Sequence, residues 1–272
     1  MDKHNVRLVA SDLDGTLLGP GAVLSPRTLA TVEMMLAADI DVAVMTGRSQ
    51  WGALPIVGQI KGLKWIGCSN GATLYSVDTG TVVERFDLVA GVATDIVTMV
   101  RAAIPEVAFG WESPEGVFFT DDWTRNMTSL DTGYTPVYES KIRLESQMAE
   151  TQVAKLMICH DEIVGFEWLE QLRPYLPGEV SVSTSGAPFV EVTAPEANKG
   201  AALSRLAERL AVPQSETIAF GDHSNDLEML SWAGVGFAMA NAHPEVHARA
   251  DRVAPHHAED GVAVVLESLL GR

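Results

Sequence analysis

Four short apolar runs, each followed at once by polar or turn-forming residues, restrict the fold of this chain of 272 residues more than any other feature. The runs are VRLVAS, IDVAVM, LKWIGC and TIAF. Each is mostly apolar, as expected of a strand that is covered on both faces. Helical patterns alternate with them, and one opens with Ser25 and Pro26, which are typical of a helix start. Strands that alternate with helices predict a parallel sheet with helices on its faces.

The middle of the chain has a different pattern. From about Glu84 to Ala187, alternating strands such as GVFFTDD and AKLMICH accompany two helical segments and most of the aromatic residues. We therefore expect an α/β core from residues 1–83 and 188–272, interrupted by an α+β domain at 84–187. Trp111 and Phe118 are expected in the core of that domain. The triplet Asp121-Asp122-Trp123 could line a specificity pocket or form a solvated turn.

The composition excludes several classes of protein. A net charge of −17 disfavours nucleic acid and anionic membranes as partners, because both bind basic surfaces. The two cysteines, Cys68 and Cys159, are far apart, so neither a disulfide framework nor a zinc site is expected. The sequence has no pattern of a signal peptide or membrane span. We expect a cytoplasmic protein that is a monomer or a weak homodimer.

Polar side chains follow each of the four predicted strands. In a parallel sheet, ligands bind beyond the carboxyl ends of the strands, so these side chains should gather at one edge. The segments concerned are Asp12 and Asp14, then Thr46-Gly47-Arg48, then Ser69-Asn70-Gly71, and finally Asp222 with Asn225 and Asp226, with Lys199 at the start of the preceding helix. Several carboxylates at one place suit a hard divalent cation, and Mg²⁺ is the usual choice beside phosphate.

The first two aspartates have the chemistry of phosphoryl transfer. Asp12 is ionised at neutral pH and can attack phosphorus to give an acyl phosphate that water can hydrolyse. Asp14 is placed to protonate the leaving alcohol and then to deprotonate the attacking water. Lys199, the Thr46 hydroxyl and nearby backbone N–H groups could neutralise the charge on the phosphoryl oxygens.

The ordered segments DLDGTL, TGR, SNGA, NKG and GDHSND resemble those of the haloacid dehalogenase-like hydrolase superfamily, and within it the Cof-type, class IIB phosphatases. The resemblance covers essentially the whole core and, weakly, the inserted domain. It implies a Rossmann-like parallel-sheet core with an inserted α+β cap that determines substrate specificity. It also implies Mg²⁺-dependent hydrolysis of a small phosphorylated metabolite, most readily a sugar or polyol phosphate, through an aspartyl-phosphate intermediate.

The same resemblance assigns roles to the residues of these segments. Asp12 becomes the nucleophile and Asp14 the acid/base. Mg²⁺ would be held by Asp12, the backbone carbonyl of Asp14 and Asp222, with Asp226 next to them. The phosphate would be contacted by Thr46, Lys199 and Asn225. Gly47 would let the backbone approach it closely, and Arg48 is a further candidate for binding it.

Some alternatives remain open from the sequence alone. Arg48 could bind phosphate or pair with acidic side chains, and Asn70 beside Gly71 could be a plain turn. A phosphohexomutase-like phosphotransferase and a non-catalytic sugar-phosphate sensor are rival functions. A signalling receiver domain shares the clustered acids and the lysine, but it is about half as long and lacks an inserted domain.

Overall fold

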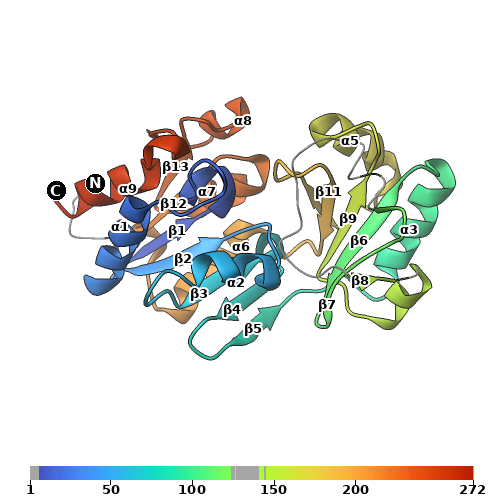
Figure 1. Ribbon diagram of the computed structural model, residues 1–272, viewed down its shortest axis with the longest axis horizontal. Coiled ribbons are helices and arrows are strands. Elements are labelled where there is room, and N and C mark those ends of the chain that lie inside the picture. The colour runs from blue at the N-terminus through green and yellow to red at the C-terminus, as the bar shows by residue number, and fades with distance from the viewer. Residues whose placement is uncertain (1–5, 124–125, 127–140, 144, 272) are drawn as a thin grey trace. The chain divides into compact units, whose positions relative to one another are not determined.

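The computed structural model describes residues 6–123, 126, 141–143 and 145–271 (Figure 1). The chain divides into two compact units, one formed by residues 1–84 and 198–272 and the other by residues 85–197. Each unit has its own sheet and its own apolar core.

An eight-stranded sheet forms the centre of the first unit. Its strands are β1 (Leu8–Ser11), β2 (Asp41–Met45), β3 (Trp65–Cys68), β4 (Thr73–Ser76), β5 (Thr81–Arg85), β12 (Thr217–Gly221), β13 (Val235–Met239) and β14 (Arg252–Ala254). They are ordered β14-β13-β12-β1-β2-β3-β4-β5. Neighbours from β14 to β3 are parallel, and β4 is antiparallel to β3. The predicted α/β class with a parallel-sheet core is therefore confirmed.

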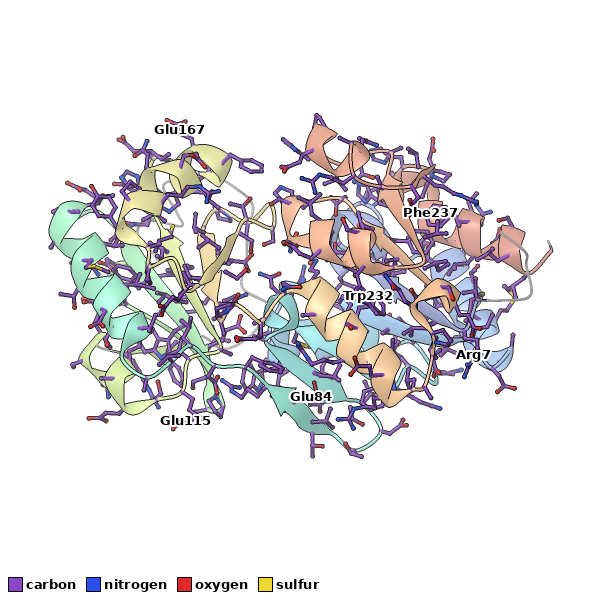
Figure 2. All side chains as sticks on the ribbon, turned by 180° about the vertical axis from the view of Figure 1, so that it is seen from behind. Arg7, Glu84, Glu115, Glu167, Trp232 and Phe237 are labelled. Carbon is purple, nitrogen blue, oxygen red and sulfur yellow. The ribbon has the colours of Figure 1, made fainter. Side chains whose placement is uncertain are left out.

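Helices cover both faces of this sheet because successive strand residues point to opposite sides. Val9 and Val44 share one apolar cluster with helices α1 (Pro26–Ala37), α2 (Gln50–Val57) and α9 (Gly261–Leu269). Ala10 and Met45 share another with α6 (Lys199–Arg209), α7 (Leu227–Trp232) and α8 (Pro244–His247). Phe237 of β13, labelled in Figure 2, stacks on Phe220 of β12 with ring centroids 5.0 Å apart.

A six-stranded sheet forms the centre of the second unit. Its strands are β6 (Ala108–Ser113), β7 (Gly116–Phe119), β8 (Lys141–Ile142), β9 (Lys155–Cys159), β10 (Ser181–Ser183) and β11 (Val190–Thr193). They are ordered β10-β11-β9-β6-β7-β8. Helices α3 (Val92–Ala103) and α5 (Gly165–Leu172) share an apolar cluster with this sheet that includes Trp111 and Phe118. Both aromatic rings are fully buried, as predicted.

The predicted inserted domain, 84–187, and the second unit, 85–197, differ at their C-terminal ends. The difference arises because β11 pairs with β9 and β10 and therefore belongs to the second sheet. Within this unit, Asp121 is exposed, Asp122 accepts a hydrogen bond of 2.7 Å from Arg101, and Trp123 is buried against Phe119 and Phe189.

Cys68 and Cys159 are both buried, and no disulfide joins them in the part of the chain that the structure describes. Among the described helices, none combines the length and the apolar character needed to cross a bilayer.

Candidate active site

The nucleophile candidate Asp12 lies at the carboxyl end of β1. Its backbone N–H continues the strand ladder by donating to the Phe220 carbonyl at 2.9 Å. The chain then leaves the sheet through a single π-type turn over Leu13–Leu17. Gly15 within this turn has φ +76°, and a Cβ there would lie 2.4 Å from Oδ2 of Asp222. Glycine is therefore required both by the backbone and by the close approach of the Asp222 carboxylate.

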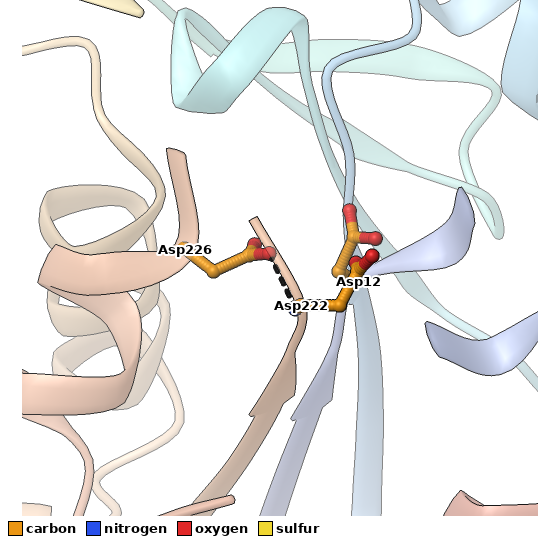
Figure 3. Close-up of side chains that lie close together, drawn as sticks. All are labelled: Asp12, Asp222 and Asp226. Carbon is orange, nitrogen blue, oxygen red and sulfur yellow. Dashed lines mark hydrogen bonds between the residues drawn. The ribbon is translucent and has the colours of Figure 1, made fainter. Parts of the chain in front are cut away.

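Three carboxylates converge beyond the ends of β1 and β12. Asp12, Asp222 and Asp226 each offer an oxygen, and these oxygens all lie within 4.8 Å of one another (Figure 3). Oδ2 of Asp226 accepts hydrogen bonds of 3.0 Å from the backbone N–H groups of Asp222 and His223, and the first is dashed in Figure 3. The Asp226 side chain is thereby fixed by the same loop that carries Asp222.

Lys199 joins this cluster from α6. Its Nζ donates to Oδ1 of Asp12 at 2.5 Å and to Oδ1 of Asp226 at 2.7 Å. The helix begins at Lys199 because the Asn198 side chain caps it, accepting from the Ala201 N–H at 2.8 Å. The Lys199 side chain is 1% exposed, so its ammonium is held by the carboxylates rather than by water.

Burial determines the proton affinities at this site. Burial raises the pKa of Asp12 well above its usual value, Lys199 lowers it, and the other aspartates raise it further. Burial likewise raises the pKa of Asp222 to about 7, with the charge of Asp226 adding to the effect. For Lys199, burial lowers the pKa, but Asp12 and Asp226 outweigh it, so the net pKa is raised and the lysine stays charged. The site thus has three carboxyl groups, those of Asp12, Asp222 and Asp226, but only one buried lysine to balance them.

The donor set fits a hard divalent cation. All three offered atoms are carboxylate oxygens, which Mg²⁺ prefers over nitrogen or sulfur ligands. Two further side chains orient Asp222: the Thr16 hydroxyl donates to its Oδ1 at 3.0 Å, and the Asn241 amide donates to its Oδ2 at 3.5 Å and to the Gly15 carbonyl at 2.8 Å. A cation at this point would offset the repulsion among the acids.

Asp14 and Arg48 form a separate pair beside the cluster. The Arg48 guanidinium donates from Nε to Oδ2 of Asp14 at 2.7 Å and from Nη2 to its Oδ1 at 2.6 Å. The Asp14 side chain is 41% exposed, whereas Asp12 is buried. Arg48 was predicted either to bind phosphate or to pair with an acidic side chain, and in this structure it pairs with Asp14. The Asp14 carboxylate is not part of the three-residue carboxylate cluster.

The other predicted phosphate ligands lie on neighbouring loops. Thr46 is buried after β2, and its Oγ1 accepts from the Arg48 N–H at 3.1 Å, with Gly47 between them. Asn225 is buried, and its Nδ2 donates to Oδ1 of Asn70 at 3.0 Å. The roles of these residues stay predictions.

Sequence reasoning missed two residues of this site. Thr16 and Asn241 both hydrogen-bond to Asp222, from positions 206 and 19 residues away in the chain. Thr16 directly follows the DLDG segment, which is a weak signal. Nothing local distinguishes Asn241 from an ordinary turn asparagine.

Comparison with known proteins supplies the family. The model of the haloacid dehalogenase-like hydrolases matches residues 9–266, nearly the whole chain. The chain belongs to this family. The predicted superfamily is thus confirmed, and the similarity spans both units.

Relatives of the chain include phosphatases. An HMP-PP phosphatase of Escherichia coli O6:H1 is 30% identical over 249 residues, covering 89% of this chain and 87% of that protein. An HMP-PP phosphatase of Serratia proteamaculans is 28% identical over 246 residues, covering 88% and 86%. The sugar phosphatase BT4131, of subclass IIB, shares the fold with a TM-score of 0.84 at 19% identity, covering 97% of this chain and 98% of that one. The chain is a phosphoric monoester hydrolase, as predicted.

Proposed function

We propose that this chain is a Mg²⁺-dependent phosphatase that hydrolyses a small phosphorylated metabolite through an aspartyl-phosphate on Asp12. The observation that carries the proposal is the buried Asp12 carboxylate, which is flanked by Lys199 and lies among two further carboxylates. A nucleophile in this setting needs compensation for the negative charge of both its neighbours and the phosphate.

The side chains of the site have distinct tasks in this reaction. An oxygen of Asp12 attacks phosphorus, and the bond from phosphorus to the alcohol oxygen breaks as Asp14, protonated and parted from Arg48, gives that oxygen its proton. Water then attacks the phosphorus and gives a proton to Asp14, while the bond to Asp12 breaks and phosphate is released. Lys199, Thr46 and Asn225 bind the phosphoryl oxygens and hold them in place.

Mg²⁺ would be held by Asp12, Asp222 and the backbone carbonyl of Asp14, and when bound it would neutralise charge between the nucleophile and the phosphoryl group. Asp226 would support this set by fixing the Asp222 loop and Lys199, with which it hydrogen-bonds. The raised pKa values of Asp12 and Asp222 support the need for a cation, because a nearby positive charge favours their ionised forms.

Two comparisons support our choice of substrate class. One relative is an HMP-PP phosphatase, and one solved structure with this fold is a sugar phosphatase. We therefore keep a sugar or polyol phosphate as the first choice, with other phosphorylated metabolites in the test panel. The inserted unit would act as the cap that determines specificity. A cytoplasmic monomer or weak homodimer remains part of this proposal.

A panel of phosphorylated metabolites, assayed for release of inorganic phosphate, tests the proposal. The wild-type enzyme should release phosphate with Mg²⁺, lose activity in EDTA and recover it with Mg²⁺ but poorly with Ca²⁺, whose coordination shell is larger and looser. Asp12→Asn should fold and lose at least about a thousandfold in kcat, because a neutral amide is a poor nucleophile.

Four outcomes would overturn parts of this proposal. Full activity without metal would contradict the metal site. Activity of Asp12→Asn within tenfold of wild type would contradict the covalent intermediate. Phosphate that moves within a sugar without being released would indicate a mutase, and binding without turnover would indicate a sensor.

A further inference from the structure

The turn Ser69-Asn70-Gly71 after β3 has an unusual backbone. All three residues have positive φ values, +54°, +56° and +88°. Glycine adopts this region freely and asparagine tolerates it, but for serine it is unfavourable. Three successive residues of this kind require other contacts to hold them, and such backbone strain is concentrated at functional sites.

Backbone hydrogen bonds tie this turn to the loop that carries Thr46. The Ser69 N–H donates to the Arg48 carbonyl at 2.8 Å, and the Asn70 N–H donates to the Thr46 carbonyl at 3.0 Å. The turn and the Thr46 loop are therefore one rigid unit at the edge of the sheet where β2 and β3 end.

The same turn packs closely against the start of α6. A Cβ on Gly71 would lie 2.4 Å from the backbone carbonyl oxygen of Asn198, the residue that caps the helix of Lys199. Arg205, one and a half turns along α6, donates to the Gly71 carbonyl at 3.2 Å. The turn thus fixes Asn70 relative to two of the predicted phosphate ligands, Thr46 and Lys199.

The Asn70 side chain points at a third predicted ligand. Asn70 is 3% exposed, and its Oδ1 accepts the hydrogen bond of 3.0 Å from Nδ2 of Asn225. The Asn225 side chain is 7% exposed, and its Oδ1 is buried without a partner among the described residues. That oxygen is an acceptor and cannot bind a phosphoryl oxygen, so the group of Asn225 that can donate to a phosphate is the Nδ2 amide that Asn70 holds.

We propose that Asn70 is a positioning residue that fixes the plane of the Asn225 carboxamide for binding the substrate phosphate. The inference rests on the proposed function, in which Asn225 contacts that phosphate. Of the two N–H groups on Nδ2 of Asn225, Asn70 takes one and leaves the other for the ligand. An Asn225 side chain without this contact could rotate and would present its amide to the phosphate for only part of the time.

A double-mutant cycle tests the inference. Asn70→Gly removes the side chain while keeping a residue that tolerates positive φ, and Asn225→Ala removes the amide that it contacts. Asn70→Gly alone should raise KM and the Kd of inorganic phosphate with Mg²⁺ by about five- to tenfold, with kcat changed less than twofold, the effect of one neutral hydrogen bond. In the Asn225→Ala background, Asn70→Gly should cause no further loss.

The control is Asp39→Gly, which makes the same kind of change at an exposed residue with φ +58° and should leave both constants unchanged. If Asn70→Gly does not fold, Asn70→Ser serves the same purpose, since a serine side chain is too short to reach Asn225 and the neighbouring Ser69 already adopts a positive φ.

The outcomes separate this inference from the proposed function. Equal losses from Asn70→Gly in both backgrounds would mean that the residue only stabilises the turn. Unchanged KM and Kd in Asn70→Gly would also overturn the positioning role of Asn70. If the wild-type enzyme still turns over substrate, the proposed function stands. A wild-type enzyme that neither releases nor binds phosphate would contradict the proposed function itself, and this inference with it.

Discussion

Each unit contains a buried lysine that contacts two carboxylates. Lys199 contacts Asp12 and Asp226 at 2.5 and 2.7 Å. In the six-stranded sheet, Lys155 contacts Glu112 and Glu191, both at 2.9 Å, and all three side chains are at most 4% exposed. For Lys155 too, burial lowers the pKa but the two carboxylates raise it by more, so it stays charged.

The two lysine clusters differ in their other neighbours and in their place in the sheet. Beside Lys199 stands a third acid, Asp222, and the pKa values of Asp12 and Asp222 are raised, first by burial. The Lys155 cluster lies within strands: Lys155 is directly opposite Glu112 in the pairing of β9 with β6, and Glu191 is on β11. A buried lysine between two carboxylates is therefore not by itself a mark of catalysis. The additional acid and the position at the strand ends distinguish the candidate active site.

Replacing each lysine in turn should give the largest difference between the two units in their effect on kcat and on stability. Lys199→Met should reduce kcat for p-nitrophenyl phosphate by at least about a thousandfold, because a charge that stabilises the phosphoryl group is lost. Lys155→Met should leave kcat per folded molecule within about twofold. It should instead lower the free energy of unfolding by about 3–5 kcal/mol, the cost of leaving buried carboxylates without their partner. Steady-state kinetics and urea denaturation measure the two effects.

Equal losses of kcat in both variants would contradict this division of roles. If Lys155→Met does not fold, Lys155→Arg retains the charge and should also keep kcat.

The Asp222 carboxylate can be displaced by a substitution that changes no charged residue. Gly15→Ala places a Cβ 2.4 Å from Oδ2 of Asp222, so the carboxylate must move. We expect kcat/KM to fall by about ten- to a hundredfold and the Mg²⁺ concentration for half-maximal activity to rise. Gly21→Ala is the matched control: its φ of +75° is nearly the same as the +76° of Gly15, but nothing lies within 4 Å of its Cβ.

Both variants carry the same backbone strain, so any loss of kcat/KM that they share measures the effect of strain alone. An equal loss of kcat/KM in the two variants would therefore show that the position of Asp222 is unimportant.

The smallest expected effect is on the pH dependence of stability without metal. The folded protein raises the pKa of Asp222 to about 7, above that of an unfolded aspartate near 4, so it binds this proton more tightly than the unfolded chain does. The resulting stability is complete below about pH 4 and is lost as the pH rises through about 7. In EDTA, the free energy of unfolding should therefore fall between pH 5 and 8, on the order of 1–3 kcal/mol.

Asp222→Asn should reduce that dependence, since the amide does not titrate, and Asp12, whose pKa is also raised, should account for what remains. Mg²⁺ at pH 8 should restore stability to the wild type by binding the ionised carboxylates. Urea denaturation at the two pH values measures each quantity. A slope that is the same in wild type and Asp222→Asn would assign the effect to other groups.

Much of the core could be predicted from sequence because its signals are local. The apolar runs that become β1, β2, β3 and β12, and the cap at Ser25, which accepts from the Thr28 N–H at 3.0 Å, need only neighbouring residues to be recognised. The convergence of Asp12, Asp222 and Asp226 followed from the rule that parallel strands end at one edge.

The remaining features depend on partners that are distant in the sequence. The strand VEVT has no local mark that assigns it to β9 rather than to the core sheet. Arg48 could have reached phosphate or an acid, and only the fold brings it to Asp14. A lysine at the start of AKLMICH carries no sign that Glu112 and Glu191 will be its partners.

The position of β1 between β2 and β12 has a consequence for how the protein is made. During synthesis, β1 through β5 can form once residue 85 has emerged, but the other side of β1 waits for a strand that lies beyond the whole inserted unit. Until β12 emerges, an apolar strand edge is open to pairing with other chains, and Asp12 has neither Lys199 nor Asp222 beside it. The candidate active site can therefore be completed only after the inserted unit and β12 have been synthesised.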